Sequence, residues 1–233
     1  MSNQYGDKGL PVQPIINDLY ENPISAEEIE RRSFEIIDRE APPHKFSDSE
    51  WQVVRRMIHT TADFQLMDMI RFSSTAIESS VRALKSGAKI FVDSNMIRSG
   101  LSLARLKQVC AKYSLLDIVC NVADPDIAAT SKERRLPRSL FAVDKARPIL
   151  GGCIAAFGNA PVALMELNRL IVEEGIKPSV VIGMPVGFVH VVESKDELMS
   201  LDVPYITITG RRGGSPLAVS AIHALCSLAM TVD

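Results

Sequence analysis

The spacing of apolar residues predicts three helices in the first third of the chain. Two of them begin at capping boxes, Ser-Ala-Glu-Glu at residues 25–28 and Ser-Asp-Ser-Glu at residues 47–50. After each box, apolar residues recur every three or four positions, which places them on one face of a helix. The third helix is expected over about residues 75–85, with Gly87 as its C-terminal stop.

Beyond these helices the pattern changes to short apolar strands that alternate with helices. The expected strands are residues 89–93, 118–122, 153–157, 180–183 and 205–209, and the expected helices lie near residues 126–135, 138–147, 161–173, 195–201 and 216–229. Fully apolar strands are typical of a parallel sheet that helices cover on both faces. We therefore expect an α/β fold, a single three-layer domain of the flavodoxin-like kind with a mostly parallel five-stranded sheet and an N-terminal helical extension.

The domain organisation follows from length and from the even composition of the chain. At 233 residues the chain allows one large domain or two small ones. It has no internal repeat, low-complexity tract or break in composition, so we expect a single α/β domain over residues 25–233. Residues 1–24 are polar and contain three prolines, and we expect an irregular N-terminal arm there.

Composition and charge exclude several classes of protein. The chain has 46% hydrophobic and 23% charged residues, which excludes a disordered, collagen-like or coiled-coil protein. Its 26 Lys and Arg residues face 28 Asp and Glu residues, for a net charge of −2. This balance gives no global field that would indicate a nucleic-acid partner, although a local cationic patch can still bind a small polyanion.

The cysteines and the apolar stretches predict a cytoplasmic protein without a membrane span. The four cysteines are too widely spaced for a zinc ribbon or a disulfide framework, and they fit buried thiols in a reducing compartment. The start of the chain has no apolar core of a signal peptide. Residues 149–165 are uncharged, but their glycines and Pro161 favour a strand, a turn and a helix over a membrane span.

The loops that follow the strands are the candidate binding site, because ligands of open α/β sheets bind beyond the carboxyl ends of the strands. Residues 158–161, 183–188 and 210–215 are glycine-rich turns that lead into helices. Glycine lets the backbone approach a ligand, and the N–H groups at the start of a helix can bind an anion. Arg211 and Arg212 in the last of these loops either hold a carboxylate or phosphate or are simply solvated, and the residues leave both interpretations open.

His59 is the candidate acid–base residue. It lies near the end of the second predicted helix, three positions after Arg56 and therefore on the same face. Such a histidine can donate a proton near neutral pH, or it is simply favoured there by the helix dipole. Taken alone, the residues favour the second interpretation. No two histidines have the spacing of a metal site, and the chain lacks nucleotide-binding motifs and the nucleophile elbow of hydrolases.

Seven motifs taken together resemble those of a known family. They are Ile29-Glu-x-x-Ser-Phe34, Met57-Ile-His59, Asp93-x-x-Met96, Gly158-Asn-Ala-Pro161, Gly183-Met-Pro-Val-Gly-Phe-Val189, Glu193-Ser-Lys195 and Gly210-Arg-x-Gly-Gly-Ser215, and they occur in this order in the precorrin-8X methylmutases. The resemblance spans about residues 19–229. The continuation His59-Thr-Thr-Ala-Asp63 is similar to the cobalt-precorrin-8 branch of that family.

The resemblance implies an isomerase of cobalamin biosynthesis. Enzymes of this family move a methyl group from C-11 to C-12 of (cobalt-)precorrin-8, which gives cobyrinate or hydrogenobyrinate. They need no cofactor and no protein-bound metal, and they form homodimers with the site near the interface. Whether the substrate of this chain carries cobalt stays open.

The resemblance also assigns roles to individual residues. The family's active histidine corresponds to His59, and its substrate-contacting serine and arginine correspond to Ser33 and Arg56. A proton held by His59 at ring C would polarise the conjugated ring toward cationic character and could be recovered after the shift. Arginines, hydroxyls and backbone N–H groups would bind the carboxylates at the rim of the ring. From the loops we expect substrate contacts from Asn159, Arg211 and Gly213.

Two interpretations from other classes compete with an enzyme. A tetrapyrrole carrier would bind the same ring without chemistry, but it gives no reason for a histidine that faces the ligand. A flavodoxin-like domain for a phosphorylated ligand would need a Ser- and Thr-rich phosphate loop after its first strand, which this chain lacks. The motifs therefore favour the methylmutase.

Overall fold

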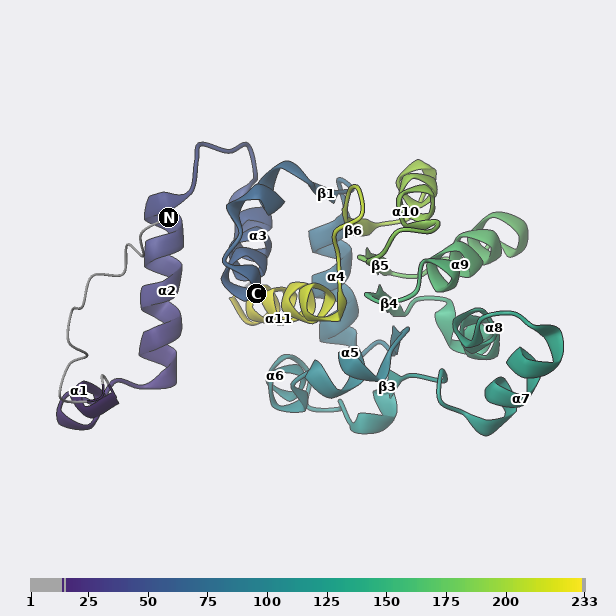
Figure 1. Ribbon diagram of the computed structural model, residues 1–233, viewed down its shortest axis with the longest axis horizontal. Helices are drawn as coiled ribbons and strands as arrows, with labels where there is room; N and C mark the ends of the chain where they lie inside the picture. The colour runs from purple at the N-terminus through teal and green to yellow at the C-terminus, as the bar shows by residue number, and fades with distance from the viewer. Residues whose placement is uncertain (1–13, 15, 232–233) are drawn as a thin grey trace, which may run out of the picture. The chain divides into compact units, whose positions relative to one another are not determined.

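The computed structural model describes residue 14 and residues 16–231, and the chain separates into two units. The N-terminal unit, residues 1–41, contains the helices α1 (Ile16–Glu21) and α2 (Ala26–Glu40). The second unit, residues 42–233, contains the other described helices and strands (Figure 1). The expected helical extension before the sheet is therefore present. The units divide after residue 41, whereas the sequence placed the start of the α/β domain at residue 25.

The helix α1 lies within the segment that was expected to be an irregular arm. Residues 16–21 of that segment are helical, and residues 1–13 and 15 lie outside the described residues. A helix of only six residues is too short for the three- to four-residue apolar repeat to be recognised in the sequence. The expectation of an irregular arm is thus wrong for residues 16–21.

The helix α2 begins and ends where local sequence signals place it. The hydroxyl of Ser25 accepts the backbone N–H of Glu28 at 3.1 Å, which satisfies one of the free donors at the helix start. Glu28 also pairs with Arg31 and Arg32 one turn further along. The helix ends at Glu40, before a Pro-Pro pair that a helix cannot continue through.

A six-stranded sheet forms the centre of the second unit, in the order β1-β6-β5-β4-β2-β3. Its strands are β1 (Ile70–Phe72), β2 (Ile90–Val92), β3 (Ile118–Val119), β4 (Ile154–Phe157), β5 (Val180–Gly183) and β6 (Tyr205–Ile208). All neighbouring strands are parallel except β1, which is antiparallel to β6. The five expected strands are present, and the mostly parallel α/β sheet is confirmed.

The strand β1 was not expected, so the predicted count of five strands is wrong. It has only three residues, Ile-Arg-Phe, which are too few to show the alternation of a strand in the sequence. It becomes a strand because Ile70 pairs with Ile208 of β6, far along the chain. Its existence therefore depends on tertiary pairing rather than on local pattern.

Helices cover both faces of the sheet, which confirms the three-layer arrangement (Figure 1). On one face lie α3 (Asp48–Thr61), α4 (Ala76–Ser86), α5 (Asn95–Gly100) and α11 (Ser215–Thr231), and on the other lie α8 (Arg138–Leu150), α9 (Pro161–Glu174) and α10 (Val191–Ser200). The remaining elements are η1 (Phe64–Asp68), α6 (Leu103–Val109), η2 (Leu115–Asp117) and α7 (Pro125–Arg134). None of the described helices is long and apolar enough to cross a membrane.

Two apolar cores hold these layers together. The helix α11 is buried on nearly all sides because its residues are apolar all round, and it contacts α3, α4, α5 and α6. On the opposite face, Phe91 of β2 and Phe157 of β4 lie with their ring centroids 5.8 Å apart, against Leu164 and Leu167 of α9. The two cores therefore lie on opposite faces of the sheet and hold the helices of each layer against it.

Candidate active site

The strand order reverses between β2 and β4 at the carboxyl edge of the sheet. The strand β3 extends the sheet on one side of β2, whereas β4 lies on its other side. In open α/β sheets such a reversal leaves a crevice where ligands bind. Asp93 directly follows β2 and Gly158 directly follows β4, so both residues lie at this crevice.

The carboxylate of Asp93 occupies the crevice. It accepts the backbone N–H groups of Gly158 at 3.1 Å, Asn159 at 2.9 Å and Ala160 at 2.8 Å. Asp93 is only 2% exposed, and its burial raises the pKa of this carboxyl, although the three N–H donors act in the opposite direction. We expected these N–H groups to be available to an anion on the ligand. That expectation is wrong for this loop, because they bind Asp93.

A pocket of about 320 Å³ opens next to the crevice, between α3, α5 and α11. Arg56 and Thr60 line it from α3, Met96 and Gly100 from α5, and Ser215, Pro216, Val219, Ser220 and His223 from α11. The pocket therefore combines a cation and hydroxyl groups with apolar wall, which suits an apolar ring edge that carries a carboxylate. Arg56 was expected to contact the substrate from the sequence, and the structure places it in this pocket.

His223 lines the pocket, although no pattern in the sequence indicates a role for it. Its Nε2 accepts the backbone N–H of Ser102 at 3.0 Å, so the neutral ring carries its proton on Nδ1. Two turns earlier on α11, the hydroxyl of Ser215 lies 3.0 Å from that of Ser94 and joins the start of α11 to the start of α5. No spacing in the sequence pointed to His223, because its partner is 121 positions away.

His59 lies on the last turn of α3, one turn beyond Arg56, and its side chain is exposed. It is not one of the residues that line the pocket. The helix ends at Ala62, whose φ of 53° lies in the left-handed region, and Asp63 then caps the following turn by accepting the N–H of Gln65 at 2.8 Å. The helix places His59 one turn after Arg56, and the turn capped by Asp63 fixes the backbone directly after this part of α3.

Arg212 ties the loop at residues 210–215 to the end of α3. Its guanidinium pairs with the carboxylate of Asp63 and donates to the amide oxygen of Gln65 at 3.0 Å. Arg211, the neighbouring arginine, lies 5.4 Å from the centroid of the Phe188 ring instead, a cation–π distance. The sequence did not decide which arginine would meet a ligand. Arg212 has protein partners that occupy it, so Arg211 is the better candidate.

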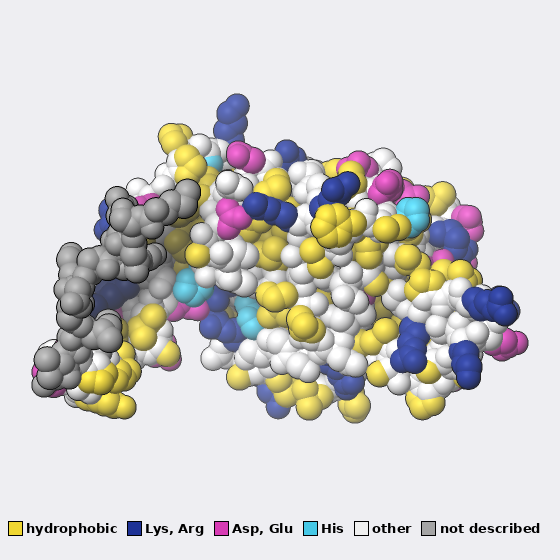
Figure 2. All heavy atoms as spheres, viewed as in Figure 1, with side chains coloured by type: hydrophobic (Ala, Val, Ile, Leu, Met, Phe, Trp, Pro, Cys, Tyr) yellow, Lys and Arg dark blue, Asp and Glu magenta, His cyan; other side chains and the backbone are white. Residues whose placement is uncertain are grey.

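An apolar rim accompanies Arg211 at the ends of β5 and β6. Phe188 is 82% exposed and Val189 70% exposed, and Val186 is also exposed. Met96 of α5, which follows β2, adds a further exposed apolar side chain. Figure 2 shows hydrophobic side chains beside Lys and Arg side chains on the face where these strands end. Exposed apolar side chains next to a cation suit a flat, apolar ligand with carboxylates at its edge.

The glycines of the loop at residues 210–215 allow it to pack directly against the loop after β5. The N–H of Gly214 donates to the carbonyl of Met184 at 2.9 Å, and the N–H of Gly187 donates to the carbonyl of Arg211 at 3.3 Å. A Cβ atom on Gly213 would overlap the carbonyl oxygen of Met184 and lie 2.5 Å from that of Pro185. Gly213 is therefore required for this packing, independently of any contact with substrate.

Replacing Gly213 with alanine should lower the free energy of unfolding by roughly 1–3 kcal/mol, because two backbone loops must separate to admit the methyl group. Chemical denaturation would measure this change. The matched control is Gly151→Ala, since Gly151 has a φ of −63° and nothing within 4 Å of its Cβ position. That variant should be as stable as the wild type or slightly more so. Equal stability of both variants would contradict the loop packing.

Lys195 of α10 binds the same loop from the interior of the protein. Its side chain is fully buried, and its ammonium donates to the carbonyls of Gly210 at 3.0 Å and Arg212 at 2.6 Å. Burial lowers the pKa of Lys195 to about 8. This lysine belongs to the motif Glu193-Ser-Lys195, but no pattern in the sequence indicates its role.

The other expected contact residues lie in different places. The side chain of Asn159 is exposed, on the loop that Asp93 holds. Ser33 lies on α2 in the N-terminal unit, where its hydroxyl donates to the carbonyl of Ile29 at 2.8 Å. The structure thus brings Arg56, His59 and Arg211 to the carboxyl edge of the sheet, and it describes Ser33 within the other unit.

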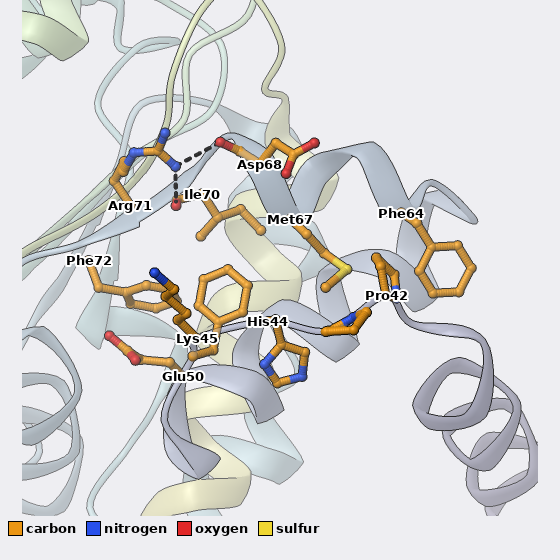
Figure 3. Close-up of a pocket in the computed structure, with 12 residues that line it drawn as sticks. Pro42, His44, Lys45, Glu50, Phe64, Met67, Asp68, Ile70, Arg71 and Phe72 are labelled. Atoms are coloured by element: carbon orange, nitrogen blue, oxygen red, sulfur yellow. Dashed lines mark hydrogen bonds between the residues drawn. The ribbon is translucent and has the colours of Figure 1, made fainter.

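A pocket larger than the one at Arg56 lies elsewhere, beside β1 (Figure 3). It has a volume of about 600 Å³ and is lined by η1, β1 and the segment before α3. Its walls are about as polar as they are apolar, and the guanidinium of Arg71 donates to the carbonyls of Asp68 and Ile70 rather than into the space. None of the expected site residues lines it, so we place the candidate site at the carboxyl edge of the sheet despite the smaller volume there.

Comparisons with known proteins bear on the identity of this site. The family model for precorrin-8X methylmutase matches residues 28–228. A cobalt-precorrin-8 methylmutase of Leptospira interrogans is 43% identical over 86% of this chain and 92% of its own length. A precorrin-8X methylmutase of a Sinorhizobium species is 36% identical over 84% of this chain and 92% of its own length.

A solved structure is similar as well. The precorrin-8X methylmutase of Thermus thermophilus has a TM-score of 0.77 and 45% sequence identity, and the match covers 86% of this chain and 96% of that one. These matches confirm the resemblance and the methylmutase function that the seven sequence motifs predicted, and they include the carboxyl-edge loops and the helix with His59. The chain belongs to the precorrin-8X methylmutase family.

Proposed function

We propose that this protein moves the methyl group from C-11 to C-12 of cobalt-precorrin-8, with His59 as the proton donor. The observation that carries the proposal is the placement of Arg56 and His59 on one face of α3, with Arg56 in a pocket at the carboxyl edge of the sheet. A cation in the pocket can hold a ring carboxylate while the next turn presents the imidazole to the ring.

The chemistry requires the ring to become more electron-poor as the methyl group moves. A proton delivered by His59 at ring C supplies cationic character to the conjugated system, and the imidazole can take the proton back after the shift. The remaining contribution of the protein is to hold the ring in one conformation, so that the migrating bond stays aligned with the π system. Met96 and Phe188 offer apolar contact to the ring, and Arg56 and Arg211 offer charged contact to its rim.

Asn159 and Ser33 complete the proposed set of substrate contacts. The side chain of Asn159 is exposed and can therefore contact a ligand bound next to the loop that Asp93 holds. Ser33 rests on the family motif at residues 29–34. For Gly213 we propose a backbone contact, since it lies in the same loop as Arg211, two positions further along.

The cobalt-containing substrate is supported by two observations. The residues that continue the histidine motif, Thr60 to Asp63, are similar to those of the cobalt branch, and the relative at 43% identity carries that name. We expect faster conversion of cobalt-precorrin-8 than of metal-free precorrin-8X at equal concentration, followed by the visible spectrum. A faster reaction with the metal-free ring would assign the chain to the other branch.

The same experiment separates an enzyme from a carrier. A methylmutase changes the visible spectrum of bound substrate toward that of the rearranged ring at catalytic amounts of protein. A carrier would shift the spectrum only in proportion to the protein added, and the shift would then stay constant. That second result would contradict the proposed function.

We further propose that the protein works as a homodimer. The pocket at Arg56 is about 320 Å³, at the lower end of the range for small-molecule sites, and it can hold only one edge of a tetrapyrrole. A second copy would supply the surface that covers the rest of the ring, since closed two-fold dimers are the commonest assembly. Light scattering at micromolar concentration should give about twice the 25.6 kDa mass of the chain. A single species of monomer mass would contradict this expectation.

A further inference from the structure

Three charged side chains are buried in the described part of the chain: Asp93, Glu166 and Lys195. Asp93 is paired with the N–H groups of the loop after β4, and Glu166 is paired with Arg169 on the surface of α9. Lys195 differs from both, because its described hydrogen bonds go only to backbone carbonyls. A buried cation that neutral oxygens alone hold needs a separate explanation.

Stability by itself does not explain this lysine. Moving an ammonium out of water is costly, and replacing a buried charge with an apolar side chain of similar size is often neutral or stabilising. A methionine would fill the same space on α10 without that cost. A lysine at this position therefore indicates that the orientation of its two carbonyl partners serves the function of the loop as well as its folding.

The two carbonyls stand on either side of Arg211. Lys195 holds the carbonyl of Gly210, in the peptide group directly before Arg211, at 3.0 Å and the carbonyl of Arg212, one residue further along, at 2.6 Å. The peptide group between Arg211 and Arg212 is held separately, because the Arg211 carbonyl accepts the N–H of Gly187 at 3.3 Å. Gly210 has a φ of 72°, in the left-handed region, where the backbone turns sharply. One ammonium group therefore holds the backbone on both sides of Arg211, and this helps to set the direction in which the Arg211 side chain leaves the loop.

We propose that Lys195 is a positioning residue for the methylmutase reaction, which orients Arg211 toward the substrate by holding the carbonyls of Gly210 and Arg212. The inference rests on the proposed role of Arg211 in substrate binding. Lys195 itself is fully buried and does not touch the substrate.

A double-mutant cycle between Lys195→Met and Arg211→Ala tests this proposal. Each single variant should lower kcat/KM about 10- to 100-fold, mainly through KM, because a charge-assisted hydrogen bond to a ring carboxylate is lost or misdirected. The double variant should lose no more than about twofold beyond Arg211→Ala, since Lys195 then has no arginine left to orient. The control, Lys132→Met, changes an exposed lysine on α7 and should leave kcat/KM unchanged.

Three results would overturn the proposal. The first is a folded Lys195→Met protein with wild-type kcat/KM and only a shifted melting temperature, which makes the lysine structural. The second is independent losses that multiply in the double variant. The third is failure of both Lys195→Met and Lys195→Gln to fold. Wild-type turnover and product binding, measured alongside by the visible spectrum, show separately whether the proposed function holds.

Discussion

Replacing His59 with alanine should lower the turnover of substrate about 10²- to 10⁴-fold, the range expected for loss of a general acid. Binding should persist, because Arg56, Arg211 and the apolar rim remain. The variant should therefore hold unrearranged substrate, visible as a spectrum that does not drift toward product. Single-turnover absorbance measurements at saturating protein would separate binding from rearrangement.

The pH dependence of the wild-type rate distinguishes the two roles that an imidazole can take. If protonated His59 is the competent form, the rate falls as pH rises and the imidazolium is lost. If the rate falls on the acid side instead, the neutral imidazole acts as a base. The matched control is His190→Asn, an exposed histidine with a φ of 59°, a conformation that asparagine tolerates. A His59→Ala protein with wild-type turnover would leave the mechanism without its acid.

Replacing Arg56 with alanine should weaken substrate binding about 10- to 100-fold, since a charge-assisted bond to a carboxylate contributes about 1.5–3 kcal/mol. Thermal stability should change little, because Arg56 lies at the wall of an open pocket and is only partly buried. Titration of the visible spectrum with product would give the affinity, and a melting curve would give the stability.

Two further variants show whether the charge or its geometry matters at Arg56. Arg56→Lys keeps the positive charge without the planar fork of the guanidinium, and it should restore only part of the affinity. Arg98→Ala removes an exposed arginine from α5 and should leave binding unchanged. An Arg56→Ala protein that unfolds, or that binds as tightly as the wild type, would make Arg56 a structural residue.

The sequence by itself determined the features that depend on neighbouring residues. The capping serines Ser25 and Ser47 start α2 and α3 as expected, because a cap needs only the next three residues. Three of the five expected strands, β2, β4 and β5, are fully buried on both faces, which leaves a short run without polar residues that can be recognised in the sequence. The order of the motifs likewise identified the family, and the family resemblance implied the catalytic role of His59.

The tertiary structure decided which polar groups are occupied and which are available to a ligand. The N–H groups of the loop after β4 looked available in the sequence, but they bind Asp93, which is 65 positions or more away along the chain. Arg211 and Arg212 are adjacent and alike in the sequence, yet only Arg212 meets Asp63, 149 positions away. Periodicity reports which face a side chain occupies, whereas its hydrogen-bond partner depends on loops that meet only after the sheet has formed.

The strand β1 and the buried Lys195 show the same division. A three-residue strand is defined by its pairing with β6, and no window of sequence contains both partners. A lysine in a short helix such as α10 is expected on the surface, and it is buried here because two carbonyls of the loop at residues 210–212 converge on it. The sequence therefore determined the layers of the fold and the family of this protein. Long-range packing decided which side chains of the site are available to a ligand. The reason is that folding brings together charges and backbone groups that lie far apart along the chain.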